Sequence, residues 1–426
     1  MRRGPSLALG SLVLLAAAAG CLPAREAAVA PAGAPTPNLR PATPADWTRL
    51  PADGPGGGCL APLRHAPDTA HLDFWPIHRV RLAYRVVDRE SHRLNLDTAT
   101  GPERLRAITS YANRHLEDLP RAVLPRRAPP PRTRARFRLA LSGEEWVSFH
   151  DDEEVPRHVH KGPRQNIGHG LAFQRYGARA DSTLNVVLLP FELAAGKRAS
   201  RPGAVGVAIG SRYLKLVAHW SAYDVPWDFH RTLLHEVAHV FTVGHTWAQD
   251  DGCDDTPRHR PCWNLGEPAG CDTADLSNNL MDYTAIAAAL TPCQVGRIHA
   301  AIAREGSRQR AYVEPAWCEG SGRPDIDLRD TFVVRRATDL DAGVVLHAGA
   351  YLEVRCRLSI PAGRRITVLP GSTLALAGGR LHNACDLTWA GVHVGVDGGR
   401  RGELLWREGS SLEDLALPPD DPTPRS

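Results

Sequence analysis

The sequence predicts an α+β fold in which a twisted mixed sheet with its helices is followed by a small all-β region. Alternating apolar and polar stretches are interspersed with amphipathic helical segments as far as about Cys318. From Asp325 to Glu408 the pattern changes to short β runs punctuated by Gly and Pro. The roughly 350 residues that follow residue 70 also exceed one typical domain, so two domains are expected.

The first region holds the elements of one sheet and its helices. His78–Val87 alternates as a half-buried strand does, and Gly101–Leu119 carries apolar residues on one side of a helix. A further helix is expected over Thr291–Arg304, because Thr291 can cap it and Gln294 completes a capping box. The remaining apolar runs predict strands at Ala135–Leu141, Leu184–Leu189 and Val205–Ile209.

Short strands separated by turn residues make up the second region. The clearest are Tyr351–Arg355, Ile366–Leu369, Thr373–Leu376 and Val392–Val396. We interpret them as a small β-helix or a sandwich that serves stability or surface attachment. This region contains no convincing catalytic set.

The segment His235-Glu236-Val237-Ala238-His239 predicts a metal site. His235 and His239 are four residues apart, so on a helix their side chains lie on the same face and can hold two corners of a tetrahedral zinc ion. Glu236 lies beside them, where it can accept a proton from an activated water. His245 follows six residues after His239, at the spacing of a third ligand, and three protein ligands leave a position open for catalysis.

Four blocks of this chain resemble the pappalysin/cytophagalysin family of metzincin metallopeptidases. They are His235–Trp247 (HEVAHVFTVGHTW), Asp254–Pro257 (DDTP), Asn279–Thr284 (NLMDYT) and Leu290–Arg297 (LTPCQVGR), and the resemblance covers about residues 75–318. It implies a metzincin-like catalytic domain with a twisted mixed sheet, a backing helix and a zinc helix. The implied zinc ligands are His235, His239 and His245, with Glu236 as general base.

The same resemblance gives roles to two residues of the NLMDYT block. Met281 is the only methionine besides the initiator, and it would form the Met-turn beneath the metal. Tyr283 would place a phenol near the metal, where it can stabilise the oxyanion of the tetrahedral intermediate. The resemblance also implies structural calcium nearby, for which Asp251, Asp254 and Asp255 are candidate ligands, although a solvated acidic loop explains them nearly as well.

The chain departs from the family at Thr242, where a glycine normally ends the zinc helix and aims the third histidine. A β-branched residue disfavours positive φ, so either the turn is rebuilt around Gly244 or the site is strained or degenerate. Two alternatives stay open. One is a gluzincin-type protease with Glu267 as third ligand, which the Met-turn argues against. The other is a surface binding protein with a decayed protease domain.

The N-terminus predicts export. Arg2 and Arg3 precede an apolar run and a small-residue cleavage site, which is typical of a signal peptide over residues 1–20. Cys21 follows Ala-Ala-Gly as in a bacterial lipobox, so we expect it to be lipidated at the cell envelope, with plain secretion as the alternative. The remaining boundaries are a Pro/Ala/Gly-rich tether or pro-segment (21–70), the catalytic domain (71–320), the β-rich domain (325–410) and a disordered tail (411–426).

Charge and cysteine content limit the partners. The net charge of +4 is small and its arginines are scattered, so no nucleic-acid partner is expected, and we expect a monomer that acts on proteins or peptides. Eight cysteines remain beyond Cys21, which in an exported chain indicates disulfides rather than a zinc knuckle. Cys356 and Cys385 suit a bridge within the β-rich region. A free Cys59 could instead occupy the open zinc position and keep an enzyme latent.

Overall fold

The computed structural model describes residues 37–50, 58–91, 93–158, 167–190, 205–218, 227–247 and 251–416. They belong to one compact unit that begins at Pro37. The expected signal peptide, Cys21 and residues 417–426 of the expected disordered tail lie outside these residues. The expectation of disorder is wrong at the start of that tail, because Ser411 and Leu412 form a strand that pairs with residues 380–381. In the part of the chain that is described, no helix is both long and apolar enough to cross a membrane.

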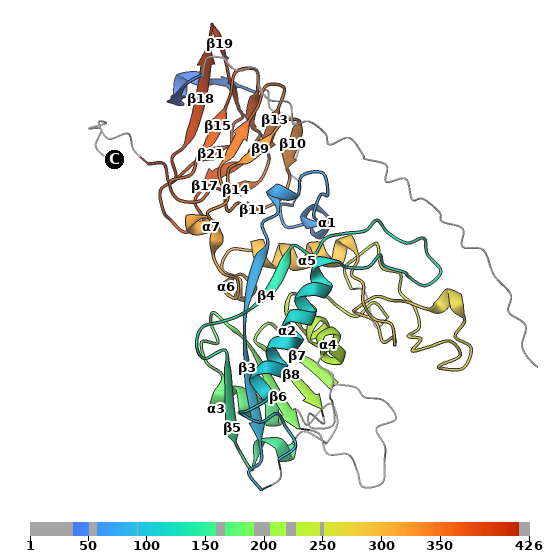
Figure 1. Cartoon of the computed structure of the whole chain (residues 1–426). Coiled ribbons are helices and arrows are strands. Elements are labelled where there is room, and N and C mark those ends of the chain that lie inside the picture. The colour runs from blue at the N-terminus through green and yellow to red at the C-terminus, as the bar shows by residue number, and fades with distance from the viewer. Residues whose placement is uncertain are drawn as a thin grey trace, which may run out of the picture. The chain divides into compact units, whose positions relative to one another are not determined.

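A mixed six-stranded sheet forms the first region, in the order β4-β3-β6-β8-β7, with β5 also paired to β3 (Figure 1). All pairs are parallel except β7 with β8, so β7 is an antiparallel edge strand. The strands are β3 (His78–Asp88), β4 (Phe137–Leu141), β5 (Val147–Asp151), β6 (Leu184–Pro190), β7 (Val205–Ile209) and β8 (Tyr213–Ala218). The helices of this region are α2 (Gly101–Glu117), α3 (Ile167–Tyr176), α4 (Trp227–Val240), α5 (Pro292–Ala303) and α6 (Arg308–Ala311).

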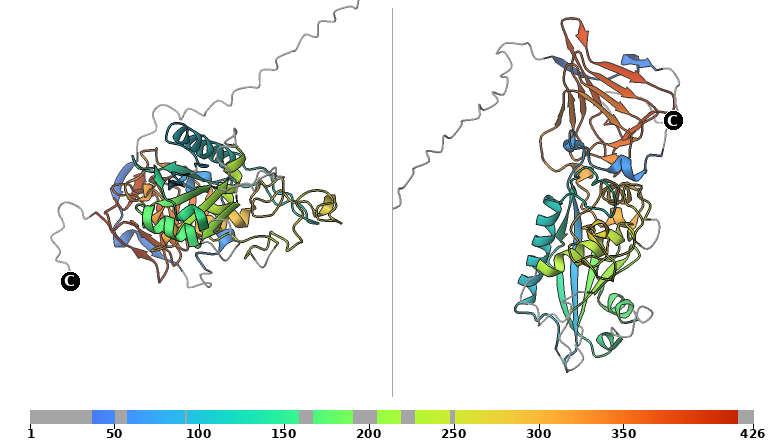
Figure 2. Two further views of the ribbon diagram at one scale, coloured as in Figure 1. Left: turned by 90° about the horizontal axis from the view of Figure 1, so that it is seen from below. Right: turned by 90° about the vertical axis from the view of Figure 1, so that its right-hand side faces the viewer.

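Helices cover both faces of this sheet. Successive side chains of a strand point to opposite faces, so one strand contributes to the cores on both sides. On β6, Val186 and Leu188 join the core formed with α2 and α4, whereas Val187 and Leu189 pack toward α3. The right-hand view of Figure 2 shows α2 and α3 on opposite sides of the sheet. The main core therefore lies between the sheet and α4, the helix that carries the paired histidines.

Most of the elements expected from the sequence are present within two residues of their expected ends. The capping box of α5 is formed, since the Thr291 hydroxyl accepts a hydrogen bond from the backbone N–H of Gln294. The described elements of this region that were not predicted include β5, β8, α3 and the short α6. The alternation over β5 is short, and β8 contains Lys215 at a buried position, which hides its apolar pattern.

The second region pairs its strands as a three-sided parallel β-helix (Figure 1). Each coil contributes one strand to each of three sheets, and each coil stacks on the previous one in parallel register. The strands are β9 (Ile326–Leu328), β10 (Thr331–Val334), β11 (Thr338–Asp339), β12 (Val344–Leu346), β13 (Tyr351–Val354), β14 (Arg357–Ser359), β15 (Ile366–Val368), β16 (Thr373–Leu376), β17 (Arg380–His382), β18 (Val392–Asp397), β19 (Arg400–Arg401), β20 (Glu403–Trp406) and β21 (Ser411–Leu412). Of the two architectures left open by the sequence, this pairing is that of the β-helix.

The expectation of a flexible tether or pro-segment over residues 21–70 is wrong as regards flexibility for residues 38–49 and 62–65, which form strands and a helix. Strand β1 (Asn38–Pro41) pairs antiparallel with β18, and β2 (Trp47–Arg49) pairs parallel with β20. A short helix, α1 (Pro62–His65), packs against α5. The physical reason is that these residues complete open edges of the β-helix, which their own composition does not reveal.

Every cysteine in the described residues is in a disulfide, and the pairs are Cys59–Cys356, Cys253–Cys293, Cys262–Cys271 and Cys318–Cys385. The expected Cys356–Cys385 bridge is therefore wrong, because each of the two has a partner from outside the β-helix strands. The latency hypothesis for Cys59 fails as well, since its sulfur is bonded to Cys356 and offers no free thiolate. The same pairing excludes a zinc knuckle of cysteines.

A buried ion-pair cluster also connects the two regions. Asp339 on β11 accepts a hydrogen bond from Arg310 of α6 at 2.5 Å and is paired with Arg357 of β14. Burial would raise the pKa of Asp339, but the two guanidinium groups outweigh it and hold that pKa well below its usual range. Arg357 also donates to the backbone carbonyl of Ala303 at the end of α5, at 2.5 Å.

Candidate metal centre

Three histidine side chains converge where α4 ends. His235 and His239 lie on one face of α4, one turn apart, and His245 comes back to them after the helix ends. The Nε2 atoms of His235 and His239 are 3.0 Å apart, and that of His245 lies 3.1 Å from each. The residues expected as ligands are thus brought together, each by one ring nitrogen.

The tautomers of this cluster fit a metal ion. His235 Nδ1 lies 2.6 Å from the carbonyl oxygen of Leu280, and His239 Nδ1 lies 2.7 Å from that of Val243. A carbonyl only accepts, so Nδ1 carries the proton in both rings and each Nε2 presents a lone pair. The lone pairs of His235 and His239, which face each other at 3.0 Å, repel one another, and a cation bound by the three rings would remove that repulsion.

Burial keeps the three imidazoles neutral, as metal ligands must be. It lowers the pKa of His235 to about 3, assisted by the neighbouring His239. Burial and the same neighbour lower the pKa of His245 to about 4, and burial lowers that of His239.

The helix that carries these ligands ends in a Schellman turn with Thr242 at its left-handed position. The N–H of Val243 bonds to the carbonyl of Ala238, and the N–H of Thr242 bonds to that of His239, which is the hydrogen-bond pattern of this motif. Thr242 has a φ of 74°, whereas Gly244 lies outside the left-handed region. The turn is therefore not rebuilt around Gly244. Thr242 adopts the conformation that a glycine would have taken, at a steric cost.

The expected Met-turn lies against the histidines. Met281 is fully buried in the main core. The carbonyl of Leu280 accepts from His235, as described above, and the carbonyl of Met281 accepts from the N–H of Thr246, just after His245, at 3.4 Å. Asn279 holds this turn, because its Oδ1 accepts from the N–H of Met281 at 2.9 Å. Through its backbone carbonyls the turn thus contacts His235, the first of the three histidines, and Thr246, the residue after the third.

Glu236 lies on the buried side of α4, against the edge strand β7. It is only 5% exposed, and a methyl group placed on Gly206 of β7 would lie 2.3 Å from its Oε1. Burial raises the pKa of Glu236 to about 8, against the opposing effects of the Ala208 N–H and the nearby Lys215. A carboxyl group with such a pKa suits proton transfer near neutral pH.

Aromatic rings flank His245. Tyr283 is half exposed and meets the His245 ring edge-on at a centroid distance of 5.1 Å, while Trp247 stacks on His245 at 5.2 Å. Burial raises the pKa of the Tyr283 hydroxyl, and the charge of Glu236 raises it further. Tyr283 and Glu236 therefore lie near the same space beside the histidines.

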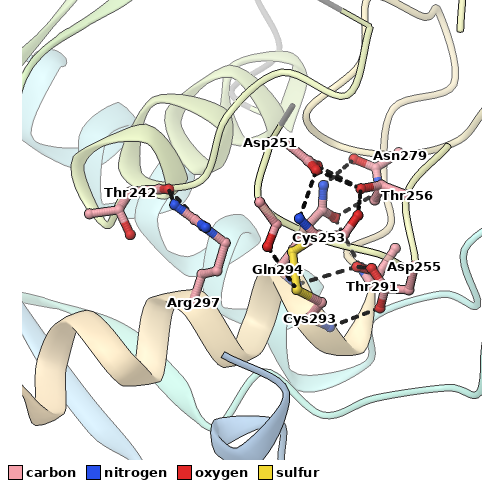
Figure 3. Close-up of a disulfide and its surroundings, with 11 residues drawn as sticks. Thr242, Asp251, Cys253, Asp255, Thr256, Asn279, Thr291, Cys293, Gln294 and Arg297 are labelled. Carbon is pink, nitrogen blue, oxygen red and sulfur yellow. Dashed lines mark hydrogen bonds between the residues drawn. A yellow bond between two sulfur atoms is a disulfide. The ribbon is translucent and has the colours of Figure 1, made fainter. Parts of the chain in front are cut away.

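The aspartates considered for calcium have other partners. Asp251 accepts from the Thr256 hydroxyl at 2.8 Å and from the N–H of Cys253 at 3.0 Å. Asp255 accepts from the Thr291 hydroxyl at 2.7 Å and from the N–H of Cys293 at 2.9 Å. Asp255 thus connects the loop after His245 to the start of α5, beside the Cys253–Cys293 disulfide, whereas Asp251 bonds within that loop (Figure 3). Asp254 is exposed, and a calcium site here stays a prediction.

Glu267, the ligand of the gluzincin alternative, lies in an exposed turn. Its backbone N–H bonds to the carbonyl of Asn264, and its carbonyl accepts from the N–H of Trp263. Among the described residues, the side chains that could share a metal ion at the end of α4 are His235, His239 and His245.

Several residues that shape the centre were not predicted. Leu280 and Val243 act through backbone carbonyls, which a sequence motif does not display. Gly206 and Lys215 come from strands far away in the chain. Arg297 was only one member of the LTPCQVGR block, and its guanidinium binds the carbonyl oxygen of Thr242.

No protein-family model matches this chain, and no curated protein matches it. Among solved structures it is similar to mature mirolysin of Tannerella forsythia in complex with a cleaved peptide. That match has 17% identity and a TM-score of 0.36, over 55% of this chain and 94% of the other. A mirolysin structure with compound 9 bound matches at 14% identity and a TM-score of 0.37, over 56% of this chain and 96% of the other.

Proposed function

We propose that this chain is an exported, zinc-dependent endopeptidase of the pappalysin-like metzincin type. The observation that carries the proposal is the convergence of three Nε2 atoms within 3.1 Å of one another. In His235 and His239 the Nδ1 atom is held by a backbone carbonyl, so that Nε2 presents a lone pair. His235, His239 and His245 would hold zinc and leave a coordination position open. His245, and not Glu267, lies close to the paired histidines, which favours the metzincin hypothesis over the gluzincin hypothesis.

The residues around the histidines suit peptide hydrolysis. Zinc bound there would polarise the scissile carbonyl and make a water more acidic. Glu236 would accept a proton from the attacking water and return it to the leaving amine. The Tyr283 hydroxyl would donate a hydrogen bond to the developing oxyanion. Export, lipidation at Cys21, structural calcium and a monomeric state belong to the same proposal and rest on the sequence.

Removal of the base tests this function. Glu236→Ala leaves all three ligands in place, so we expect normal zinc content with casein hydrolysis reduced by several orders of magnitude. A zinc-loaded mutant that cleaves casein at more than about a tenth of the wild-type rate would remove Glu236 from this role. A wild-type protein that binds zinc and cleaves no protein substrate would favour the alternative of a binding protein with a decayed protease domain.

A further inference from the structure

Arg297 lies where it can compensate for the threonine that ends the zinc helix. Its Nε and Nη2 atoms donate to the carbonyl oxygen of Thr242 at 2.9 and 2.7 Å (Figure 3). Both arms of one guanidinium thus bind the single backbone carbonyl of the residue with positive φ. A charged, forked donor makes stronger and more directional bonds than a neutral one.

The turn that Arg297 binds is connected directly to the metal ligands. Thr242 is followed by Val243, whose carbonyl accepts from His239 Nδ1 at 2.7 Å. Two residues later comes His245, whose direction depends on the same turn. A rotation of the Thr242 peptide out of the left-handed region would therefore move both the support of His239 and the position of His245.

The guanidinium of Arg297 is itself held in place. Gly252 lies against it so closely that a methyl group at that position would be 2.2 Å from Nη1. Cys253, next in the chain, is bonded to Cys293 on α5, one turn before Arg297. Asp255 adds hydrogen bonds from the same loop to Thr291 and to the N–H of Cys293. Helix α5 thus contacts the chain on both sides of His245: at Thr242 through Arg297, and at Cys253 through the disulfide.

We infer that Arg297 is a positioning residue for the metal centre, and that it stabilises the left-handed Thr242 turn which a glycine would form without support. The inference rests on the proposed zinc site. It predicts coupling between positions 242 and 297, because a glycine at position 242 removes the cost that Arg297 offsets.

The test is a zinc-affinity series, measured by competition with a chromophoric chelator below the melting temperature of each metal-free protein. Arg297→Met should weaken zinc binding about 10- to 100-fold, the usual effect of losing a residue that orients a ligand. Arg297→Lys should fall between this variant and the wild type, since an ammonium keeps the charge without the fork. Arg304→Met, which removes an exposed arginine at the end of the same helix, is the matched control and should bind zinc as the wild type does.

The double variant Arg297→Met with Thr242→Gly decides the mechanism. We expect its zinc affinity to lie within about twofold of that of Thr242→Gly alone. Wild-type affinity in Arg297→Met, or a double variant as weak as Arg297→Met, would overturn the inference. If Arg297→Met does not fold, the lysine variant and its double with Thr242→Gly give the same comparison. Failure of the proposed zinc site gives a different result from failure of this inference. If His245 is not a zinc ligand, His245→Ala binds zinc with the affinity of the wild type.

Discussion

The β-helix and the histidine helix both require residues in the left-handed conformation, and they meet this requirement differently. In the β-helix most residues with positive φ are glycines, as at Gly349 with a φ of 87° and Gly371 with a φ of 80°, and the N–H of the first bonds to the carbonyl of the second. The exceptions among the described residues of this region are Asp386 and Asp414, neither of which is β-branched. At the end of α4 the corresponding residue is Thr242, with a φ of 74°. A β-branched residue can stay in this conformation only if other contacts outweigh its steric cost, and Arg297 supplies such contacts.

The two regions also differ in how their cores are built. The β-helix stacks similar coils, so each strand pairs with the strands of adjacent coils. The metal centre combines α4, the Met-turn, β7 and α5, which are far apart in the sequence. Local repetition thus gives a regular core in the β-helix, whereas the metal centre depends on contacts between distant segments that have to be held together individually.

The largest stability effect is expected where the two regions meet, at Asp339. Asp339→Ala would remove the buried carboxylate between Arg310 and Arg357 and leave Arg357 only its contact with the half-exposed Glu305, so we expect a loss of about 3–5 kcal/mol in the free energy of unfolding, measured by urea denaturation. A loss below about 1 kcal/mol would mean that the cluster does not couple the β-helix to the first region.

The pH dependence of stability gives a second check on the same cluster. The depressed pKa of Asp339 means that its contribution is present above the unfolded-state pKa of about 4 and is lost as the pH falls toward the folded-state value. Wild-type protein should therefore lose stability below about pH 4 more steeply than Asp339→Asn. Equal slopes for the two proteins would show that this carboxyl group is not depressed.

A smaller pair of effects, opposite in sign, tests the comparison of turns directly. Gly349→Ala should destabilise by about 1 kcal/mol or more, because the added methyl has open space and only the positive φ opposes it. Thr242→Gly should be neutral or should stabilise by up to about 1 kcal/mol, since relief of strain is partly offset by the greater freedom of the unfolded chain. Thermal unfolding of the metal-free proteins measures both. Destabilisation by both substitutions would contradict the view that Thr242 is strained.

How far the sequence could predict this molecule depended on the distance between the residues involved. Strands such as β3 and β7, and the capping box at Thr291, follow from local patterns and were predicted with nearly correct ends. Residues 38–49 were interpreted as tether because nothing local shows that they pair with strands about 350 residues later. The Cys59–Cys356 bridge, which spans 297 positions, was missed for the same reason.

The residues of the candidate site also differ in whether the sequence alone reveals their role. His235, Glu236 and His239 were identifiable because the spacing of ligands on a helix is visible in the sequence, and His245 because it follows at the spacing of a third ligand. The effect of Thr242 could only be stated as alternatives, because its outcome depends on a guanidinium from another helix. Arg297 could not be distinguished from the other arginines of the chain until its distance to the Thr242 carbonyl was known.

The central claim is that His245 completes a zinc site with His235 and His239, and zinc stoichiometry tests it most directly. Metal content would be measured after dialysis against dilute zinc for the wild type, His245→Ala and Glu267→Ala. We expect one zinc ion per chain in the wild type and in Glu267→Ala, and little or none in His245→Ala, because two imidazoles do not retain zinc in a dilute exterior. Full retention in His245→Ala together with loss in Glu267→Ala would contradict the claim and favour a glutamate as third ligand.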